Sequence, residues 1–217
     1  MLPIKKKLIK YNHSSRNGQF IKYIVIHDTG NSRAGADAEA HYKYFNGGDR
    51  QASAHYFVDD KGILQLVEDS QASWHCGDGK GKYGITNQNS IGVEICINAD
   101  GDYEKAVNNT VDLVKHLMDK HSIPPDRVVR HYDASRKICP ATMRENNWAR
   151  WQAFKKSLTE QPMDDLAKAL KVLVDRGIIN TPDYWQQNAR VGKTVNGAYA
   201  AALIEKVAAF LEKNPPP

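Results

Sequence analysis

Apolar residues in the first 160 positions recur in short runs and alternations that predict five β-strands. The expected strands cover about residues 21–27, 53–59, 63–67, 90–97 and 127–131. Between the second and third strands, Asp59-Asp60-Lys61-Gly62 has the residue types of a hairpin turn. We therefore expect these two strands to pair with each other.

Helical stretches are predicted between the strands. The first covers about residues 34–46 and is closed by Gly47-Gly48. The second covers about 103–121, has apolar residues at three- and four-residue steps, and stops at Pro124-Pro125. A third lies near residues 144–158. Helices that alternate with strands indicate an α/β domain, which we place at residues 1–158.

The remainder of the chain predicts a linker at 159–163 and a small helical domain at 164–217. An amphipathic stretch from Met163 to Arg176 is followed by Gly177, a typical helix stop. Thr181-Pro182 has the residue types that cap and open a second helix. Asn196 to Lys213 predicts a third. We expect a small C-terminal helical bundle, and disorder in the last three prolines.

Composition limits the function classes. The chain has 217 residues, 41% hydrophobic and 25% charged, as a globular protein does. Its net charge of +5 and pI near 9.0 suit an acidic polymer such as nucleic acid or an anionic cell wall. No arginine run with interleaved aromatic residues favours nucleic acid. Three cysteines, an odd number, favour a metal site or reduced thiols over a disulfide framework.

No apolar stretch is long enough for a transmembrane helix, which excludes stable membrane insertion. The N-terminus, Met1 to Lys10, is basic but lacks the apolar region of a secretory signal. We expect a protein made without such a signal.

A carboxylate interrupts the strand expected at 90–97. The odd positions from Ile91 to Ile97 are aliphatic, and the even positions are Gly92, Glu94 and Cys96. Strand alternation sends Glu94 to the face opposite the aliphatic residues. Two interpretations remain open: a half-exposed glutamate on the solvent side of a sheet, or a general base that takes a proton from water.

Two histidines and a cysteine follow expected strands. His27 ends the apolar run 21–26, and His131 and Cys139 lie eight residues apart after the last strand, with Lys137 between them. A loop must fold back to bring the last two together. Two histidines and one cysteine form a three-ligand set with an open fourth position, which is typical of catalytic zinc. Each residue alone also fits an ordinary role, in the core or, for Lys137, on the surface.

Five segments in fixed order extend this pattern. They are 23–30 (Tyr-Ile-Val-Ile-His-Asp-Thr-Gly), 52–58 (Ala-Ser-Ala-His-Tyr-Phe-Val), 72–77 (Ala-Ser-Trp-His-Cys-Gly), 89–94 (Asn-Ser-Ile-Gly-Val-Glu) and 130–140, which contains Lys-Ile-Cys-Pro. The series resembles the type 2 N-acetylmuramoyl-L-alanine amidases, which include many phage endolysins, Bacillus-type autolysins and the peptidoglycan recognition proteins. The resemblance covers roughly residues 20–158.

The resemblance implies a fold and a set of site residues. The fold is a central mixed β-sheet flanked by helices, with Zn2+ at the floor of a groove that holds peptidoglycan. The implied zinc ligands are His27, His131 and Cys139. Glu94 matches the acidic catalytic position, and Lys137 the basic residue that would stabilise the oxyanion. The implied substrate-binding residues are His55, Trp74 and His75. Some relatives have a tyrosine where this chain has Ala54, so Glu94 is the expected base.

The implied activity is zinc-dependent hydrolysis of the amide bond between N-acetylmuramic acid and L-alanine. A phage or prophage endolysin is the expected role, held in the host cytoplasm before lysis. The alternatives are a bacterial autolysin with the same chemistry and a non-catalytic peptidoglycan-recognition module. The helical domain is expected to bind cell wall or to form a homodimer.

Overall fold

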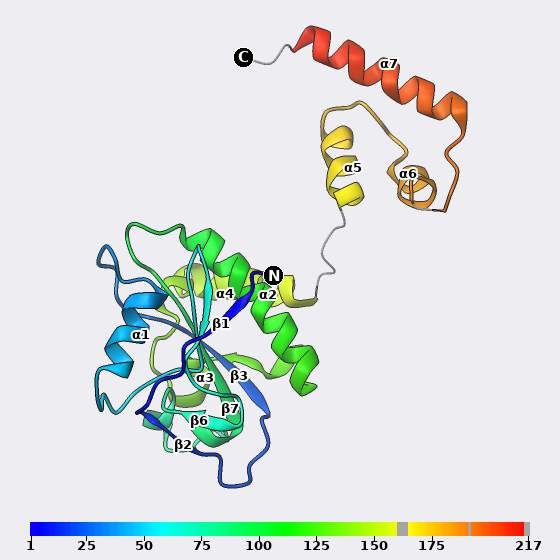
Figure 1. Cartoon of the computed structure of the whole chain (residues 1–217). Coiled ribbons are helices and arrows are strands. Elements are labelled where there is room, and N and C mark those ends of the chain that lie inside the picture. Colours follow the sequence, from blue (N-terminus) through cyan, green and yellow to red (C-terminus); the bar gives the residue numbers. More distant parts are fainter. Residues whose placement is uncertain (160–164, 191, 215–217) are drawn as a thin grey trace. The chain divides into compact units, whose positions relative to one another are not determined.

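The computed structural model describes residues 1–159, 165–190 and 192–214. The chain divides into two compact units, residues 1–160 and 161–217, each described here by itself (Figure 1). The expected linker beyond Thr159, the expected helix start at 163 and 164, and the three terminal prolines lie outside the described residues. Among the described helices, none is long and apolar enough to cross a bilayer.

A six-stranded sheet forms the centre of the first unit. In spatial order its strands are β1 (Ile4–Lys6), β5 (Ile63–Gln65), β4 (Tyr56–Val58), β7 (Ser90–Ile95), β3 (Tyr23–Asp28) and β8 (Val128–Arg130). Only the β4–β5 pair in this sheet is antiparallel, and the other neighbours are parallel. The expected mixed sheet is thus confirmed. So is the hairpin, whose Asp59 N–H donates to the Gly62 carbonyl at 3.1 Å.

The sequence pattern missed the shortest elements. The five expected strands exist but are shorter than predicted. Three strands were not expected: β1, β2 (His13–Ser15) and β6 (Gln71–Ser73), the last two forming a separate antiparallel pair. Each has only three residues, too few for an alternation to stand out, and pairs with a segment more than 50 positions away. The helical turn α3 (His131–Ser135) was missed for the same lack of length.

The helices of the first unit follow the predictions closely. The second predicted helix matches α2 (Tyr103–His121), and the third matches α4 (Glu145–Thr159) within a residue. The first, α1 (Ala38–Asn46), begins four residues later than expected. The Asp37 carboxylate caps it by accepting the Ala40 N–H at 2.8 Å, which fixes the helix start.

The two faces of the sheet have different roles. One face carries fully buried aliphatic side chains, namely Ile24, Ile26, Ile91, Val93 and Ile95. Helices α2 and α4 cover this face and complete the main core (Figure 1). Each such side chain contributes about 1.5–3 kcal/mol by leaving water. The opposite face carries Val25, His27, Gly92 and Glu94, and packs against α1, α3 and loops.

In the described part of the second unit, three helices surround a small apolar core. They are α5 (Asp165–Asp175), α6 (Pro182–Asn188) and α7 (Gly197–Lys213). The buried core residues are Leu170, Ile178, Ile179 and Trp185. Helix α6 starts on Pro182 with Thr181 at the N-cap position, as predicted, but the Thr181 side chain makes no capping hydrogen bond. Asn196 does cap α7, accepting the Ala198 N–H at 2.9 Å.

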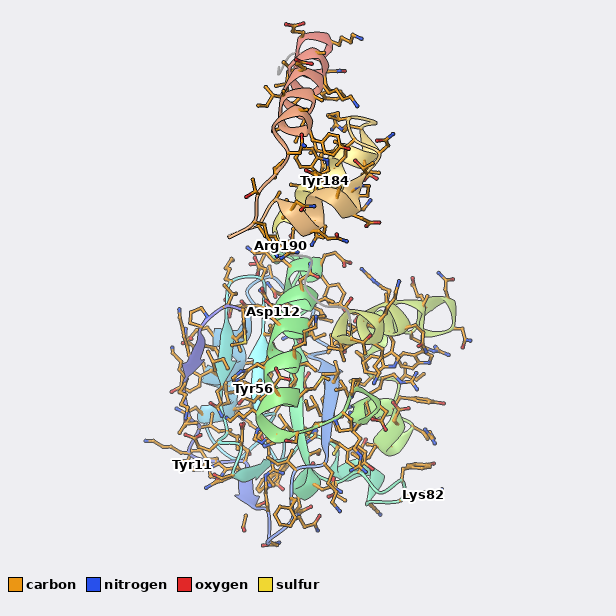
Figure 2. The ribbon with its side chains drawn as sticks, turned by 90° about the vertical axis from the view of Figure 1, so that its right-hand side faces the viewer. Tyr11, Tyr56, Lys82, Asp112, Tyr184 and Arg190 are labelled. Atoms are coloured by element: carbon orange, nitrogen blue, oxygen red, sulfur yellow. The ribbon has the colours of Figure 1, made fainter. Side chains whose placement is uncertain are left out.

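A buried carboxylate links β4 to the end of α2. Asp69 accepts hydrogen bonds from Tyr56 Oη at 2.7 Å, Lys120 Nζ at 2.7 Å and His121 Nε2 at 2.9 Å. Tyr56 is labelled in Figure 2 beside α2. Burial by itself raises the pKa of Asp69, but the three donors outweigh it, and the pKa falls below its ordinary value. The charged carboxylate therefore stabilises the folded state.

We predict that Asp69→Asn lowers the free energy of unfolding by about 1.5–3 kcal/mol at pH 7, the range for hydrogen bonds to a charged group. Because the folded pKa is depressed, the contribution is present above the unfolded pKa and is lost as pH falls through the folded value. Urea unfolding at pH 7 and near pH 3 should show that the difference in unfolding free energy between the wild type and Asp69→Asn is smaller in acid. Asp119→Asn, an exposed carboxylate beside Lys120, is the control. An equal loss in that variant would contradict the assignment.

Candidate metal centre

Three parallel strands carry candidate site residues at or just after their C-terminal ends, which lie at one edge of the sheet. His27 in β3 and Glu94 in β7 are register partners, so their side chains leave the same face side by side. His131 follows directly after β8, as the first residue of α3. Because parallel strands end at the same edge, residues far apart in sequence meet there.

Cys139 reaches this edge through a loop that folds back, as the spacing of eight residues requires. The Tyr132 N–H donates to the Cys139 carbonyl at 3.0 Å, which closes the loop beside His131. The Asp28 carboxylate, at the end of β3, accepts the backbone N–H of Thr142 at 2.9 Å and its hydroxyl at 3.1 Å. The segment that carries the cysteine is therefore tied to α3 and to β3.

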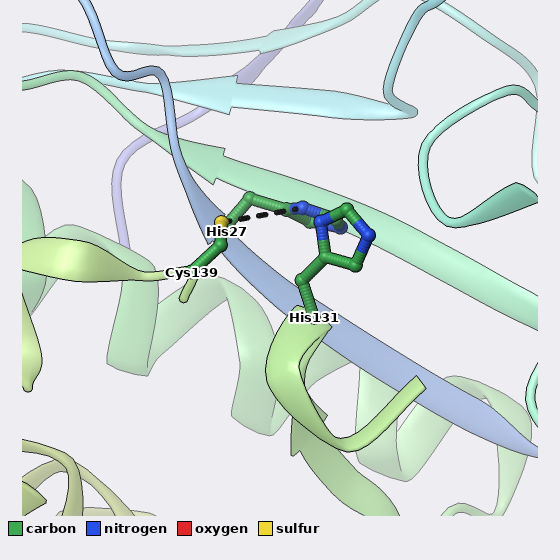
Figure 3. Close-up of side chains that lie close together, drawn as sticks. All are labelled: His27, His131 and Cys139. Atoms are coloured by element: carbon green, nitrogen blue, oxygen red, sulfur yellow. Dashed lines mark hydrogen bonds between the residues drawn. The ribbon is translucent and has the colours of Figure 1, made fainter. Parts of the chain in front are cut away.

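The two imidazoles and the thiol converge (Figure 3). One ligand-type atom from each of His27, His131 and Cys139 lies within 4.8 Å of the others. The Cys139 Sγ is 3.7 Å from His27 Nδ1. All three side chains are buried, with 2%, 3% and 5% exposed. The structure thus brings together the three residues that the sequence proposed as ligands.

The group fits a metal ion by several observations. Nδ1 of His131 is buried and has no hydrogen-bond partner in the described part of the chain. Donors around one tetrahedral zinc lie about 3–4 Å apart, so a small contraction suffices. Burial lowers the pKa of His27 and His131, which keeps both imidazoles neutral as ligands must be. Burial and the Glu94 charge raise the pKa of Cys139, a cost that a divalent cation would offset.

Glu94 lies inside the site and not on the solvent side of the sheet. Its Oε1 is 3.9 Å from His27 Nδ1, and its side chain is 18% exposed. Its Oε2 is buried without a hydrogen-bond partner among the described residues. Burial raises the pKa of Glu94 well above its ordinary value, Asp28 adds to the effect, and Lys137 opposes it. A carboxylate in this setting has the surroundings of a proton acceptor.

Lys137 lies at the exposed rim of the site. After burial and the neighbouring imidazoles, its positive charge further lowers the pKa of His27. It also lowers the pKa of His131 and the pKa of Glu94. These effects place its ammonium within electrostatic reach of the whole group.

The expected substrate-binding residues have different environments. Trp74 and His75 line the same groove as the three candidate ligands. His55 is fully buried, and its ring accepts the Gly92 N–H at 3.0 Å and contacts the Ser73 hydroxyl at 2.7 Å. A ring without exposed surface is not available for direct contact with a polymer. The contacts of His55 join β7 to the segment around Ser73.

The groove has a volume of about 320 Å³ and opens above the three ligands and Glu94. A wider cavity of about 910 Å³ shares Ile138 and Ala141 with it, so the two are neighbours. Arg136 and Arg144 line the wider cavity. The arrangement offers a reactive centre with room beside it for an extended ligand.

The sequence did not point to Asp78. Its Oδ1 is 2.8 Å from His131 Nε2, and its Oδ2 accepts the Ser135 hydroxyl at 3.0 Å. The available signal was an acidic residue between two glycines, two positions after the His75-Cys76 pair. That signal is weak, because such residues also form ordinary turns.

Comparison with known proteins assigns the chain to a family. The family described as N-acetylmuramoyl-L-alanine amidase matches residues 17–142. N-acetylmuramoyl-L-alanine amidase CwlH of Bacillus subtilis (strain 168) is 40% identical over 156 residues, 71% of this chain and 60% of that protein. XlyA of the same strain, named as the same amidase, is 43% identical over 133 residues, 61% of this chain and 42% of that protein. The chain thus spans less than two thirds of these two relatives.

A solved structure extends the likeness to the fold. The structure of the catalytic domain of XlyA superimposes with a TM-score of 0.65 and 38% identity, covering 72% of this chain and 99% of that one. The matched share corresponds in length to the first unit alone. The resemblance noted from the five sequence segments is confirmed, and the chain belongs to the N-acetylmuramoyl-L-alanine amidase family.

Proposed function

We propose that this protein hydrolyses the amide bond between the lactyl group of N-acetylmuramic acid and L-alanine in peptidoglycan. The observation that carries the proposal is the buried His27, His131 and Cys139 group beside Glu94 at the floor of a groove. Family membership and the printed names of the relatives support it. The positive net charge of +5 suits an anionic wall polymer.

We propose zinc as the metal at His27, His131 and Cys139, because two imidazoles and one thiolate form a donor set that zinc favours. Bound there, the ion would polarise the scissile carbonyl, acidify the attacking water and add positive charge beside Glu94. Three protein ligands leave room for a further one, which is the arrangement of catalytic rather than structural sites.

Glu94 and Lys137 have separate roles: the first transfers the proton and the second stabilises the negative charge. Glu94 takes a proton from the attacking water as the water oxygen bonds to the carbonyl carbon. Lys137, at the rim, stabilises the negative charge that develops on the carbonyl oxygen. Glu94 then gives the proton to the departing nitrogen as the carbon–nitrogen bond breaks. The products are the muramic carboxylate and the free amine of L-alanine.

Substrate binding is assigned to the groove and its neighbour. Trp74 offers an aromatic edge to the sugar or the stem peptide, and its indole is fixed by a 3.2 Å hydrogen bond to Ser14. Arg136 and Arg144 in the adjoining cavity suit the carboxylates of a stem peptide.

Two other roles use the same fold. A non-catalytic recognition module has no need of a three-ligand set with a buried carboxylate beside it, so the intact group favours the enzyme. An autolysin shares the chemistry and differs from an endolysin in its biological setting. We propose the endolysin role, and the relatedness to a structure described as a mutant endolysin from Bacillus subtilis, at 41% identity, supports it.

We predict about one zinc ion per wild-type chain and lysis of purified Gram-positive cell walls that releases new L-alanine amino termini. Cys139→Ser removes a ligand, so zinc affinity should fall by more than the roughly 100-fold that losing an outer partner causes, and lysis should stop. Metal content, turbidity and amino-terminal labelling measure these effects. Cys96→Ser, at a buried thiol outside the group, should keep both. Zinc without lysis in the wild type would favour the recognition module, and no zinc would reject the ligand set.

We predict that Glu94→Gln keeps zinc bound and lowers kcat by about 10²–10⁴-fold, because the amide has similar size but cannot take a proton. Zinc content and the initial rate of wall hydrolysis give the two values. An active Glu94→Gln enzyme would remove the general-base role, while loss of zinc would mean that the carboxylate acts through the metal site.

For the second unit we propose cell-wall binding. A cavity of about 330 Å³ is lined by Tyr184, Trp185, Tyr199 and polar side chains that include Asn180 and Lys206. Trp185 is 7% exposed and mainly fills the core. Tyr199 is 54% exposed, and its ring packs edge-on against the ring of Tyr184 with the two ring centroids 4.7 Å apart. Figure 2 labels Tyr184. Aromatic rings with nearby polar groups are suited to sugars and peptides.

We predict that Tyr199→Ala weakens wall binding roughly tenfold, equivalent to about 1.4 kcal/mol, because it removes the exposed aromatic wall of the cavity. Co-sedimentation with purified walls should be measured in a Glu94→Gln background, so that the walls stay intact. Ile204→Ala, an exposed apolar residue of α7 that does not line the cavity, is the matched control. Unchanged binding in Tyr199→Ala, with concentration-dependent self-association of the wild type, would favour the homodimer instead.

A further inference from the structure

One short loop contacts both imidazole ligands from behind. We call His75–Gly79 the orienting loop, which follows β6 and contains the 3-10 turn Gly77–Gly79. His75 Nδ1 lies 3.0 Å from His27 Nε2. The Asp78 carboxylate lies 2.8 Å from His131 Nε2. Each imidazole thus has its far nitrogen held by this loop, while its Nδ1 points to the metal group.

The proton positions on the His27 side follow from a chain of hydrogen bonds. The Ser90 hydroxyl donates to the Thr86 carbonyl at 2.5 Å, because a carbonyl can only accept. The Ser90 oxygen, 3.1 Å from His75 Nε2, must then accept the proton of that nitrogen. His75 Nδ1 is left with a lone pair, which accepts the N–H of His27 Nε2. The lone pair of His27 is consequently on Nδ1, the atom that faces Cys139.

For His131, a single hydrogen bond places the lone pair on Nδ1, as in His27. A charged carboxylate can only accept, so Asp78 fixes the proton of His131 on Nε2. The other carboxylate oxygen of Asp78 accepts the Ser135 hydroxyl at 3.0 Å, which holds the carboxylate in place against His131. The lone pair of His131 is therefore on Nδ1, the buried atom without a partner.

Small residues allow the loop to sit this close. A Cβ on Gly92 in β7 would lie 2.6 Å from the Cγ of His75, so the ring occupies the space above a glycine. A Cβ on Gly79 would overlap the Ala134 carbonyl oxygen of α3. The Asn87 side-chain oxygen accepts the N–H groups of His75 at 3.1 Å and Cys76 at 2.9 Å. The loop is thus built to lie against both the sheet and α3.

We propose that the orienting loop is a positioning element that fixes both histidine ligands in the tautomer that presents Nδ1 to the metal. The proposal rests on the metal site proposed above. His75 and Asp78 act on the metal through His27 and His131 and do not need to touch the substrate. This assigns His75, first expected to bind substrate, to ligand orientation. One loop then controls ligands from two different strands, β3 and the end of β8.

The test measures zinc affinity of the full-length protein by competition with a chromophoric chelator. His75→Ala and Asp78→Ala should each weaken zinc binding by about 10–100-fold, the usual effect of losing an outer partner. His75→Asn and Asp78→Asn keep a carbonyl oxygen that accepts the same N–H, and should recover most of the affinity. His41→Ala, at a partly buried histidine of α1 that belongs neither to the ligand group nor to the groove lining, should bind zinc as the wild type does.

A second variant, Gly92→Ala, tests whether zinc affinity depends on the position of the His75 ring or on the integrity of β7. Gly92→Ala should displace the His75 ring and lower zinc affinity in the wild-type background. In His75→Ala the ring is gone, so the same substitution should have little further effect. An equal loss in both backgrounds would mean that Gly92→Ala acts through the sheet, which would overturn the role of the ring.

The visible spectrum of the Co²⁺-loaded protein provides a readout that a general loss of stability does not move. A changed ligand geometry in His75→Ala and Asp78→Ala alters the spectrum, while His41→Ala leaves it as in the wild type. Wild-type zinc affinity and an unchanged Co²⁺ spectrum in both alanine variants would overturn the proposal. A wild-type protein that binds neither metal would instead reject the proposed metal site, so the two failures are distinguishable.

Discussion

The parallel pairing of β3 with β7 and β8 is the constraint on which the rest of the site depends. It brings His27, Glu94 and His131 to one edge although they lie far apart in the chain. The pairing is held in register by the aliphatic residues of the other face, which α2 and α4 bury. A slip of one residue would turn every side chain of β7 over and send Glu94 into the apolar core. Core packing therefore sets the geometry of the chemistry.

Burial gives the site its electrostatic character. The imidazoles are neutral, the thiol resists ionisation, and Glu94 resists it as well, because charged groups lose their hydration there. Polar atoms of His131 and Glu94 lack hydrogen-bond partners among the described residues. Such an arrangement is costly in an ordinary protein interior. A divalent cation at the proposed site would supply the missing charge and bonds, and would link folding of this region to metal binding.

The orienting loop contacts the two imidazoles on the side away from the metal group. Its His75 and Asp78 contacts decide which nitrogen of each ligand is free, although neither residue belongs to the three-ligand group. The loop depends in turn on Gly92 and Gly79, where a side chain would collide with it or with α3. The two units have separate cores, so the proposed reaction centre and the proposed wall-binding cavity are built from separate parts of the chain.

The sequence by itself determined the longer elements, the hairpin at Asp59 and the alternation that turns Glu94 away from the core, because periodicity and turn residues are local properties. Through its resemblance it also indicated the family and the three candidate ligands. It did not reveal β1, β2, β6 or α3, whose few residues carry no period. Only the tertiary structure decided that His55 is enclosed and that Asp78 and His75 lie behind the ligands. Those facts depend on contacts between segments far apart in the chain, and such contacts leave no periodic trace in a single sequence.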